Sequence, residues 1–381
     1  MIYLLAITFL LVSCVERKTS CLFSNYNKEV VNIKKDGAIS ELEDDDYVMK
    51  VEAYLSLPDS SETLLCDRMK YDGGYYFLLD NVRKRTIWVF DSLGNYVAKL
   101  GRKGRANAEY QNDITDWFYT QDSGNVFVFE RNSQKIHKFS IEGESLETCQ
   151  LSSWPNAIGK LEDEKSFCSY YHKMSNSGAQ LCLMSNSEIV EKVFIDLKTN
   201  MRFIPTDNSF YVNEGHLFHV PSFADSSIVF NKDSVEKVVK FTFDEKFISE
   251  EIKEDAYNDN LDRFRSFDGI QYINTFYETS RFYYLKYSYC NIFLNHLVDK
   301  RSGKQYLFVS NPTKGMLPAS VLCVRDNKIF FLITKQDVED TRHLCDDVDL
   351  YRKELSLSNP LIQRIFEGEE SLPLIFSIEI K

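Results

Sequence analysis

Basic side chains gather twice in the first third of the chain, first at residues 83–85 and again about twenty residues later. A glutamate and a tyrosine follow the second group. The second group and this pair are Arg102, Lys103, Arg105, Glu109 and Tyr110. Guanidinium and ammonium groups bind carboxylates and phosphates, so these residues are candidates for binding an acidic ligand. The alternative is that the basic side chains lie in solvated turns and that Glu109 accepts hydrogen bonds from neighbouring backbone amides.

An apolar run opens the chain and ends at a cysteine. Residues 1–13 read MIYLLAITFLLVS, and the next residue is Cys14. The run is shorter than the roughly 20 residues of a membrane-spanning helix and has the length of the apolar part of a secretory signal. Leu11-Val12-Ser13 before the cysteine matches the bacterial lipobox, whose cysteine thiol carries lipid and becomes the new N-terminus. The sequence therefore predicts a signal peptide over residues 1–13 and lipidation of Cys14, although no Lys or Arg precedes the run; the alternative is a buried strand with a chance cysteine.

Metal-ligating residue types gather near the C-terminus. On an expected strand, His343 and Cys345 share one face. The candidate metal ligands are His343, Cys345, Asp346, Asp347 and Asp349. No Cys-x-x-Cys occurs among the nine cysteines, so neither a zinc ribbon nor a thioredoxin-like motif is indicated. A metal site at this cluster is less favoured than the absence of a metal. We therefore predict no cofactor, and calcium stays an open alternative.

Catalytic signatures are missing from the sequence. It contains no Gly-x-Ser-x-Gly, no His-Glu-x-x-His, no Walker loop and no EF-hand loop. His216 and His219 lie three residues apart, which places them on opposite faces of a strand, so we expect structural roles for both. The net charge of -12 and the lack of a long basic tract argue against nucleic-acid binding.

The elements that position these residues repeat along the chain. Residues 73–101 contain three runs rich in β-forming residues with turns between them, and residues 123–150 repeat the pattern. Gly74 and Gly94 align with Gly124 and Gly143, at offsets of 50 and 49 residues. A repeat of this length with about four strands is typical of a propeller blade. The alternative is two unrelated hairpins that look alike.

Further strand-like runs continue to the end of the chain. Units begin near residues 76, 126, 180, 216, 281 and 328, which favours an all-β, six-bladed β-propeller with about four antiparallel strands per blade. The propeller is predicted over residues 47–381, after a lipidated N-terminus and tether over residues 14–46. Residues 250–265 have helical composition, and the dense aromatics of residues 272–289 are expected in the core. The run Leu374–Ile380 is expected to pair with an early strand and so to remove the exposed edges of a ring.

Several short motifs of the first repeat also point to a family. They are Leu79-Asp80, Gly101-Arg102-Lys103-Gly104 and Glu109-Tyr110. The segment from about residue 47 to 140 resembles the six-bladed β-propeller lipoproteins of Bacteroides-type bacteria, which are distantly similar to NHL-repeat propellers. Asn359-Pro360-Leu361 resembles a signature near the C-terminus of that family. Asn107-Ala108 stands where the family has Gly-Pro-Gly, so the tight turn of that loop is in doubt.

Three functions are compatible with these features. The leading hypothesis is a non-catalytic binding or scaffold lipoprotein of the cell envelope, anchored by its lipid in the outer membrane. The loops of its six-bladed ring would bind a glycan, a peptide or a partner protein. The second is a metal-dependent propeller hydrolase or lyase, similar to the lactonases, whose carboxylates from several blades surround a central ion such as calcium. The third is a purely structural part of an envelope complex, which a large exposed apolar patch would favour.

Overall fold

The computed structural model describes residues 26–40, 42, 44–59, 64, 66, 68–81, 83–106, 109–151, 157–162, 165–169, 181–185, 188–193, 210–213, 216–221, 223–231, 234–257, 260–309, 321–325, 327–344, 360–368 and 370–381.

These residues form six sheets of four or five strands, in which neighbouring strands are antiparallel with one exception, together with a small two-stranded pair. The first three sheets contain β3 (Arg68–Asp72), β4 (Tyr75–Asp80), β5 (Thr86–Asp91) and β6 (Tyr96–Leu100); β9 (Ile114–Thr120), β10 (Asn125–Glu130), β11 (Lys135–Ser140) and β12 (Ser145–Gln150); and β13 (Ala157–Glu162), β14 (Lys165–Ser169), β15 (Leu181–Ser185) and β16 (Glu188–Val193). The other three contain β17 (Phe210–Asn213), β18 (His216–His219), β19 (Ser226–Asn231), β20 (Ser234–Phe243) and β1 (Asn27–Ile33); β21 (Ile270–Glu278), β22 (Phe282–Tyr289), β23 (Ile292–Asp299) and β24 (Gln305–Phe308); and β25 (Val321–Arg325), β26 (Lys328–Ile333), β27 (Leu374–Ile380) and β2 (Tyr47–Tyr54). The small pair is β7 (Arg102–Lys103) with β8 (Glu109–Tyr110).

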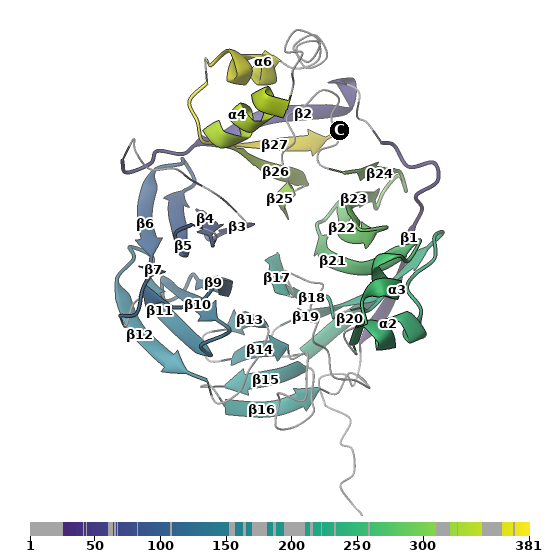
Figure 1. Cartoon of the computed structure of the whole chain (residues 1–381), viewed down its shortest axis with the longest axis horizontal. Coiled ribbons are helices and arrows are strands. Elements are labelled where there is room, and N and C mark those ends of the chain that lie inside the picture. The colour runs from purple at the N-terminus through teal and green to yellow at the C-terminus, as the bar shows by residue number, and fades with distance from the viewer. Residues whose placement is uncertain are drawn as a thin grey trace, which may run out of the picture.

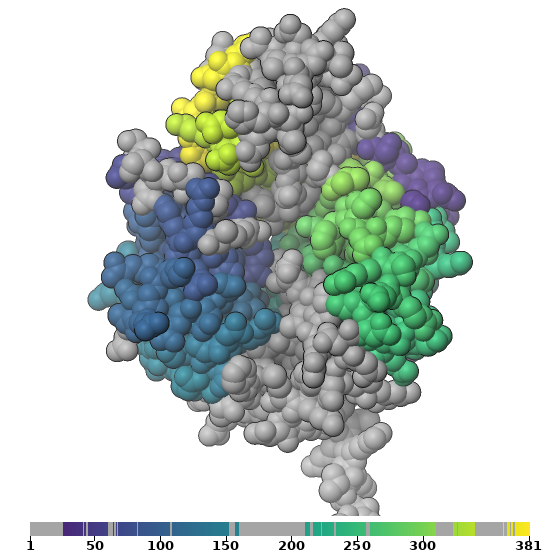
Figure 2. All heavy atoms as spheres, in the orientation of Figure 1, coloured from purple at the N-terminus to yellow at the C-terminus, as the bar shows by residue number. Residues whose placement is uncertain are grey.

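The six sheets lie around a common centre, and β3, β9, β13, β17, β21 and β25 are the strands nearest to it (Figure 1). The gaps between neighbouring ribbons contain side chains: in the space-filling view the first two sheets form one continuous surface (Figure 2). One apolar cluster includes Phe77 and Leu79 from the first sheet and Val126 and Val128 from the second, all fully or almost fully buried. The hydrophobic core therefore lies between the faces of neighbouring sheets.

The sequence repeat is a structural repeat. β4 begins at Tyr75 and β10 at Asn125, 50 residues later, and the following pairs of strands keep an offset of 49. Gly94 and Gly143 both have φ of +88°, in the turn that follows the third strand of each sheet. In each turn the glycine N–H donates to a backbone carbonyl three residues earlier, at 3.0 Å. The prediction that these two units correspond is confirmed.

An early strand, β2, and the last strand, β27, lie in one sheet. β27 is antiparallel to both β26 and β2, and its register with β2 runs from Tyr47 opposite Ile380 to Tyr54 opposite Leu374. The predicted pairing of Leu374–Ile380 with an early strand is therefore confirmed. The aromatic strands β21 and β22 also behave as predicted, since Tyr277, Tyr284 and Tyr287 are buried.

An N-terminal belt, residues 27–39, runs along the outer edges of two sheets before the chain reaches β2. β1 pairs in parallel with β20, with Asn27 opposite Lys237, and Ile39 forms a parallel bridge with Tyr306 of β24. Figure 1 shows this segment passing from β20 towards β2. The belt lies within the range that the sequence analysis assigned to a tether. Its strand was missed because the partner that makes it a strand lies 210 residues further along the chain.

Four α-helices and one short 3-10 helix, η2 (Asp44–Asp46), lie between strands of the described residues. The predicted helical stretch forms α2 (Glu250–Tyr257) and α3 (Asp262–Arg265), in the connection between β20 and β21. The other two are α4 (Lys335–Leu344) and α6 (Pro360–Glu367). No helix among the described residues is long and apolar enough to cross a membrane.

Two glycines with positive φ differ in their surroundings and permit a matched test of the packing between sheets. A Cβ on Gly94 would lie 2.2 Å from the carbonyl oxygen of Tyr54 in β2, whereas a Cβ on Gly124 would meet no atom within 4 Å. We expect Gly124→Ala to cost about 1–2 kcal/mol for its left-handed backbone alone. Gly94→Ala should cost about 1–3 kcal/mol more, because the neighbouring strand must shift. Urea unfolding measures the free energy of unfolding of both variants. Equal losses of unfolding free energy in the two variants would contradict the close contact at Gly94.

Acid should weaken the contact between the belt and β24 through one histidine. His296 is fully buried, its Nε2 lies 2.8 Å from the Gln305 side-chain oxygen, and burial lowers its pKa from 6.5 to about 4. The same Gln305 accepts from the Lys34 N–H and donates to the Asn32 carbonyl of the belt.

Because the unfolded chain binds a proton at His296 below pH 6.5 and the folded chain does not until about pH 4, stability is lost as the pH falls through this window. We expect a loss of about 2 kcal/mol between pH 7 and pH 5 from this residue. Urea unfolding at both pH values should show a shallower pH dependence for His296→Asn than for the wild type. The partly exposed His216→Asn is the control, and an unchanged slope in His296→Asn would refute the assignment.

Candidate functional site

The predicted loop between β6 and β9 is folded around the carboxylate of Glu109. One carboxylate oxygen accepts hydrogen bonds from the backbone N–H groups of Arg105 at 2.8 Å and Ala106 at 2.9 Å. The other accepts from the Arg102 guanidinium at 2.8 Å. These backbone hydrogen bonds, and then Arg102, lower the pKa of Glu109. The geometry therefore matches the interpretation in which Glu109 accepts hydrogen bonds from neighbouring amides.

Two glycines make room for the Glu109-Tyr110 pair. A Cβ on Gly104 would lie 1.9 Å from a carboxylate oxygen of Glu109, and a Cβ on Gly101 would lie 2.5 Å from the Tyr110 ring. Tyr110 is fully buried, donates its hydroxyl to the Leu100 carbonyl at 3.2 Å, and meets the His137 ring edge-on. This tyrosine is thus a core residue, and a ligand at the surface does not reach its ring.

The basic members of the loop lie at the surface. Arg102 is 80% exposed along its side chain, whereas Glu109 is 16% exposed, and Lys103 and Arg105 are also exposed. The structure therefore keeps Arg102, Lys103 and Arg105 available to an acidic ligand, and their role in binding stays a prediction. Asn107 and Ala108, where the sequence departs from the resembled family, lie outside the described residues.

A second candidate site lies at the centre of the molecule, for which the sequence analysis named no residues. The inner-strand pocket is lined by residues of β3, β9, β13 and β17, with one from β18, and its volume is about 30 Å³. Lys70 and Asp72 line it from β3, Trp117 from β9, Gly159 from β13 and Val212 from β17. Successive sheets thus each contribute their inner strand to one small hollow.

Charged groups concentrate on the β3 side of this pocket. The Lys70 ammonium donates to Asp116 at 2.5 Å and to the Trp117 carbonyl at 2.6 Å. Burial lowers the pKa of Lys70 and raises the pKa of Asp72, while the cations Arg325 and Lys70 partly offset the shift of Asp72. Shifted titrations beside a pocket are typical of functional sites, although structural ion pairs produce them as well.

Sequence reasoning missed this pocket because its residues come from five strands between residues 70 and 217. One local signal was present. Arg68, Lys70 and Asp72 alternate along a single strand, and such charges stand out on an inner strand, where most positions are buried.

A family model, described as a domain of unknown function, matches residues 28–366, most of the chain. The chain belongs to the DUF4934 family. No curated protein matches this DUF4934 chain.

Solved structures extend the comparison of this DUF4934 protein. It is similar to a candidate exported protein of Bacteroides fragilis, with a TM-score of 0.71 and 16% identity, covering 92% of this chain and 99% of that one. A member of the DUF4221 family from Bacteroides vulgatus matches with a TM-score of 0.45 and 12% identity, covering 89% and 100%. A streptogramin B lyase matches with a TM-score of 0.38 and 12% identity, covering 75% and 80%. The first likeness shows a shared fold, and the weaker two carry no argument about this family.

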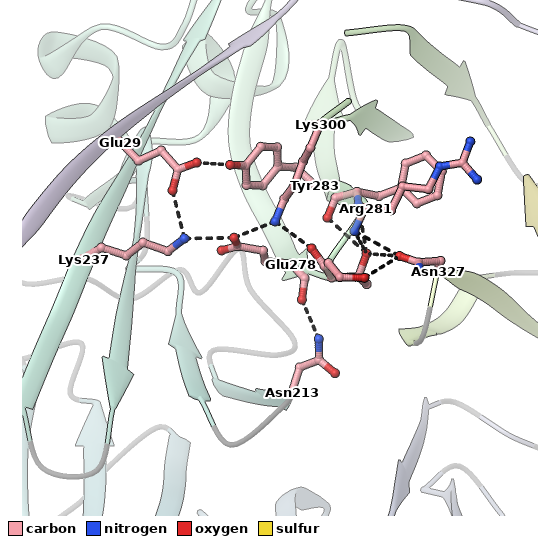
Figure 3. Close-up of polar contacts among 11 residues, drawn as sticks. Glu29, Asn213, Lys237, Glu278, Arg281, Tyr283, Lys300 and Asn327 are labelled. Carbon is pink, nitrogen blue, oxygen red and sulfur yellow. Dashed lines mark hydrogen bonds and ion pairs between the residues drawn. The ribbon is translucent and has the colours of Figure 1, made fainter. Parts of the chain in front are cut away.

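A third polar cluster of the DUF4934 chain joins the belt to two sheets (Figure 3). Lys237 of β20 contacts Glu29 of β1 and Glu278 of β21, both at 2.9 Å, and Lys300 contacts Glu278 at 2.7 Å. The Tyr283 hydroxyl donates to Glu29. Two carboxylates and two ammonium groups pair with each other here, so we assign this cluster to holding the belt in place rather than to ligand binding.

The predicted metal ligands are not brought together on a strand. His343 lies in helix α4, so the expectation of a strand there is wrong. The helix is capped at its start: the Thr334 hydroxyl accepts from the Asp337 N–H at 3.2 Å, and the Asp337 side chain accepts from the Thr334 N–H at 2.7 Å. Cys345, Asp346, Asp347 and Asp349 lie outside the described residues. Among the residues described, no group of three or more His, Cys, Asp or Glu is placed to hold a metal ion.

The two strand histidines have structural surroundings, as predicted. His219 is buried and stacks on Phe210, with ring centres 4.6 Å apart. His216 is partly exposed and lies 2.9 Å from a carboxylate oxygen of Glu236.

Replacing Glu109 with glutamine tests the structural role of the loop. A glutamine amide has one acceptor oxygen, so it can accept from the backbone N–H groups of Arg105 and Ala106 only by turning its NH2 group towards the Arg102 guanidinium, or the reverse. We therefore expect Glu109→Gln to lower the melting temperature. The exposed Glu142→Gln is the control and should melt like the wild type. A Glu109→Gln variant that melts normally but retains less ligand would favour a binding role for Glu109 instead.

Proposed function

We propose that this chain is an exported lipoprotein of the bacterial cell envelope and that its six sheets are the blades of a six-bladed propeller. The arrangement of the sheets around one centre and the pairing of β2 with β27 support this architecture. The fold shared with the candidate exported protein of Bacteroides fragilis and the lipobox that ends at Cys14 support export. In this proposal the lipid on Cys14 anchors the chain in the outer membrane.

The proposed activity is binding rather than turnover, and the ligand is a glycan, a peptide or a partner protein of the envelope. The observation that carries this proposal is the inner-strand pocket, in which inner strands of four successive sheets present charged and apolar side chains to one point. Sites of this kind, apolar with a few convergent polar groups, are the usual places of ligand binding. The exposed Arg102, Lys103 and Arg105 offer a second, acidic-ligand surface on the connection between the first two sheets.

Retention on the immobilised full chain tests binding against turnover. The wild type, held in detergent, is incubated with envelope extract, and the bound and unbound fractions are compared by mass spectrometry. We expect a ligand to be retained unchanged and to be lost from a variant of the pocket or of the basic loop. Release of a chemically altered product would contradict a purely binding role.

Lipid anchoring is tested by labelling with an alkyne analogue of palmitate in a Bacteroides host. We expect the wild type to carry the label and to sediment with membranes, and Cys14→Ser to lose both properties. Cys21→Ser, seven residues further on, is the matched control and should behave like the wild type. Labelled Cys14→Ser, or an unlabelled wild type, would refute the anchor.

A further inference from the structure

We infer that the inner-strand pocket binds two adjacent hydroxyl groups of a sugar, with Asp72 accepting a hydrogen bond from one and Lys70 donating a hydrogen bond to the other. This inference rests on the proposed binding function and names the ligand class of that site.

The size of the pocket limits what enters it. A cavity needs about 10–15 Å³ of accessible volume for each water-sized group. The volume of about 30 Å³ therefore holds roughly two such groups and is too small for a whole sugar ring. A pair of neighbouring hydroxyls fits this volume, with the ring to which they belong at the mouth of the pocket.

The charges around the pocket disfavour an ionic ligand of either sign. A cationic group next to Asp72 also meets Lys70 and Arg325, which already interact with this carboxylate. An anionic group next to Lys70 also meets Asp72 and Asp116. An uncharged group that both donates and accepts hydrogen bonds avoids repulsion from either set, and a hydroxyl is such a group.

Both side chains have hydrogen-bonding capacity for a ligand. An ammonium group has three donors, and two of those on Lys70 are used by Asp116 and by the Trp117 carbonyl. Within the described part of the chain, the hydrogen bonds to Asp72 are a long one, 3.5 Å, from the Gln121 side chain and one from the Gly73 backbone. Since Lys70 and Asp72 are two residues apart on β3, they project from the same face of the strand.

The other walls suit the carbon side of a sugar. Ile158 of β13, Phe210 of β17 and Leu217 of β18 also line the pocket and are buried apolar residues. Val212 also lines it and is 40% exposed, so apolar surface reaches the solvent there. A sugar has hydroxyls at its edge and C–H groups on its ring faces, so two hydroxyls can enter the pocket while the exposed Val212 offers an apolar contact to the ring at the mouth.

The test measures binding of the full chain in detergent to a panel of methyl glycosides and their monodeoxy analogues by calorimetry. We expect a sugar that binds the wild type to lose about tenfold or more in affinity with Asp72→Asn. Asp122→Asn, an exposed aspartate on the turn after β9, is the matched control and should bind like the wild type. Removing the hydroxyl that donates to Asp72 should weaken binding to the wild type but have little further effect on Asp72→Asn, because the two changes delete the same contact. Removing the other hydroxyl, which accepts from Lys70, should weaken both proteins to a similar extent.

A second variant guards against loss of fold. Val212→Trp adds bulk at the exposed mouth and leaves Asp72 in place, so it should abolish sugar binding while the melting temperature stays near that of the wild type. A sugar that binds Asp72→Asn and Val212→Trp as tightly as the wild type would overturn the pocket inference while binding itself stands. Retention of an envelope protein or peptide, with no methyl glycoside bound, would also overturn the inference and keep the proposed function. A chain that retains nothing would overturn both.

Discussion

The pairing of β2 with β27 is the contact on which the rest of the structure depends. Each sheet buries its apolar side chains against the faces of its neighbours, so a sheet without a neighbour on one side would expose part of its core. β27 lies between β26 and β2, and this sheet packs against the sheet of β21–β24 through residues such as Leu297 and Phe331. An early strand and the last strand therefore complete one sheet, and that sheet packs against both of its neighbours.

The belt connects two neighbouring sheets along their outer edges. It crosses from β20 to β24 with backbone hydrogen bonds and with charged contacts at Lys35, which lies 2.9 Å from Glu245 and over the Tyr289 ring. The Lys237–Glu278 network holds the same segment from the other side. Such partly buried pairs are costly to break singly, because each loss leaves a partner charge without its neighbour.

The sequence predicted the fold best where contacts are local. Hairpins such as β4–β5 and β10–β11 carry their own turn residues and alternate apolar positions, so their bounds follow from a few neighbouring residues. β1 has no such local cause, since its partner is far away in the chain. Helix α4 differs from the strand predicted at His343 because Thr334 and Asp337 cap a helix nine residues earlier, a local signal that does not involve the histidine.

The candidate sites divide in the same way. The Glu109 loop was recognised because its residues lie within nine positions of one another, and the structure explains the signal through the space that Gly101 and Gly104 leave for their partners. The inner-strand pocket was missed because only the topology brings Asp72, Gly159 and Val212 to one place. Which strand of each sheet lies nearest to the centre depends on the topology, so a short stretch of sequence does not predict the residues of this pocket.

The position of β2 also sets the order in which the chain can be finished. Its partner β27 begins at Leu374, 327 residues after β2 begins at Tyr47. At a synthesis rate of 5–20 residues per second, β2 waits roughly 20–60 s for its partner to be made. During that time its edge is a template for pairing with other chains or a substrate for holding chaperones and proteases. The sheet that contains β2 is thus the last of the six to be completed, although β2 is the second strand of the described chain to be made.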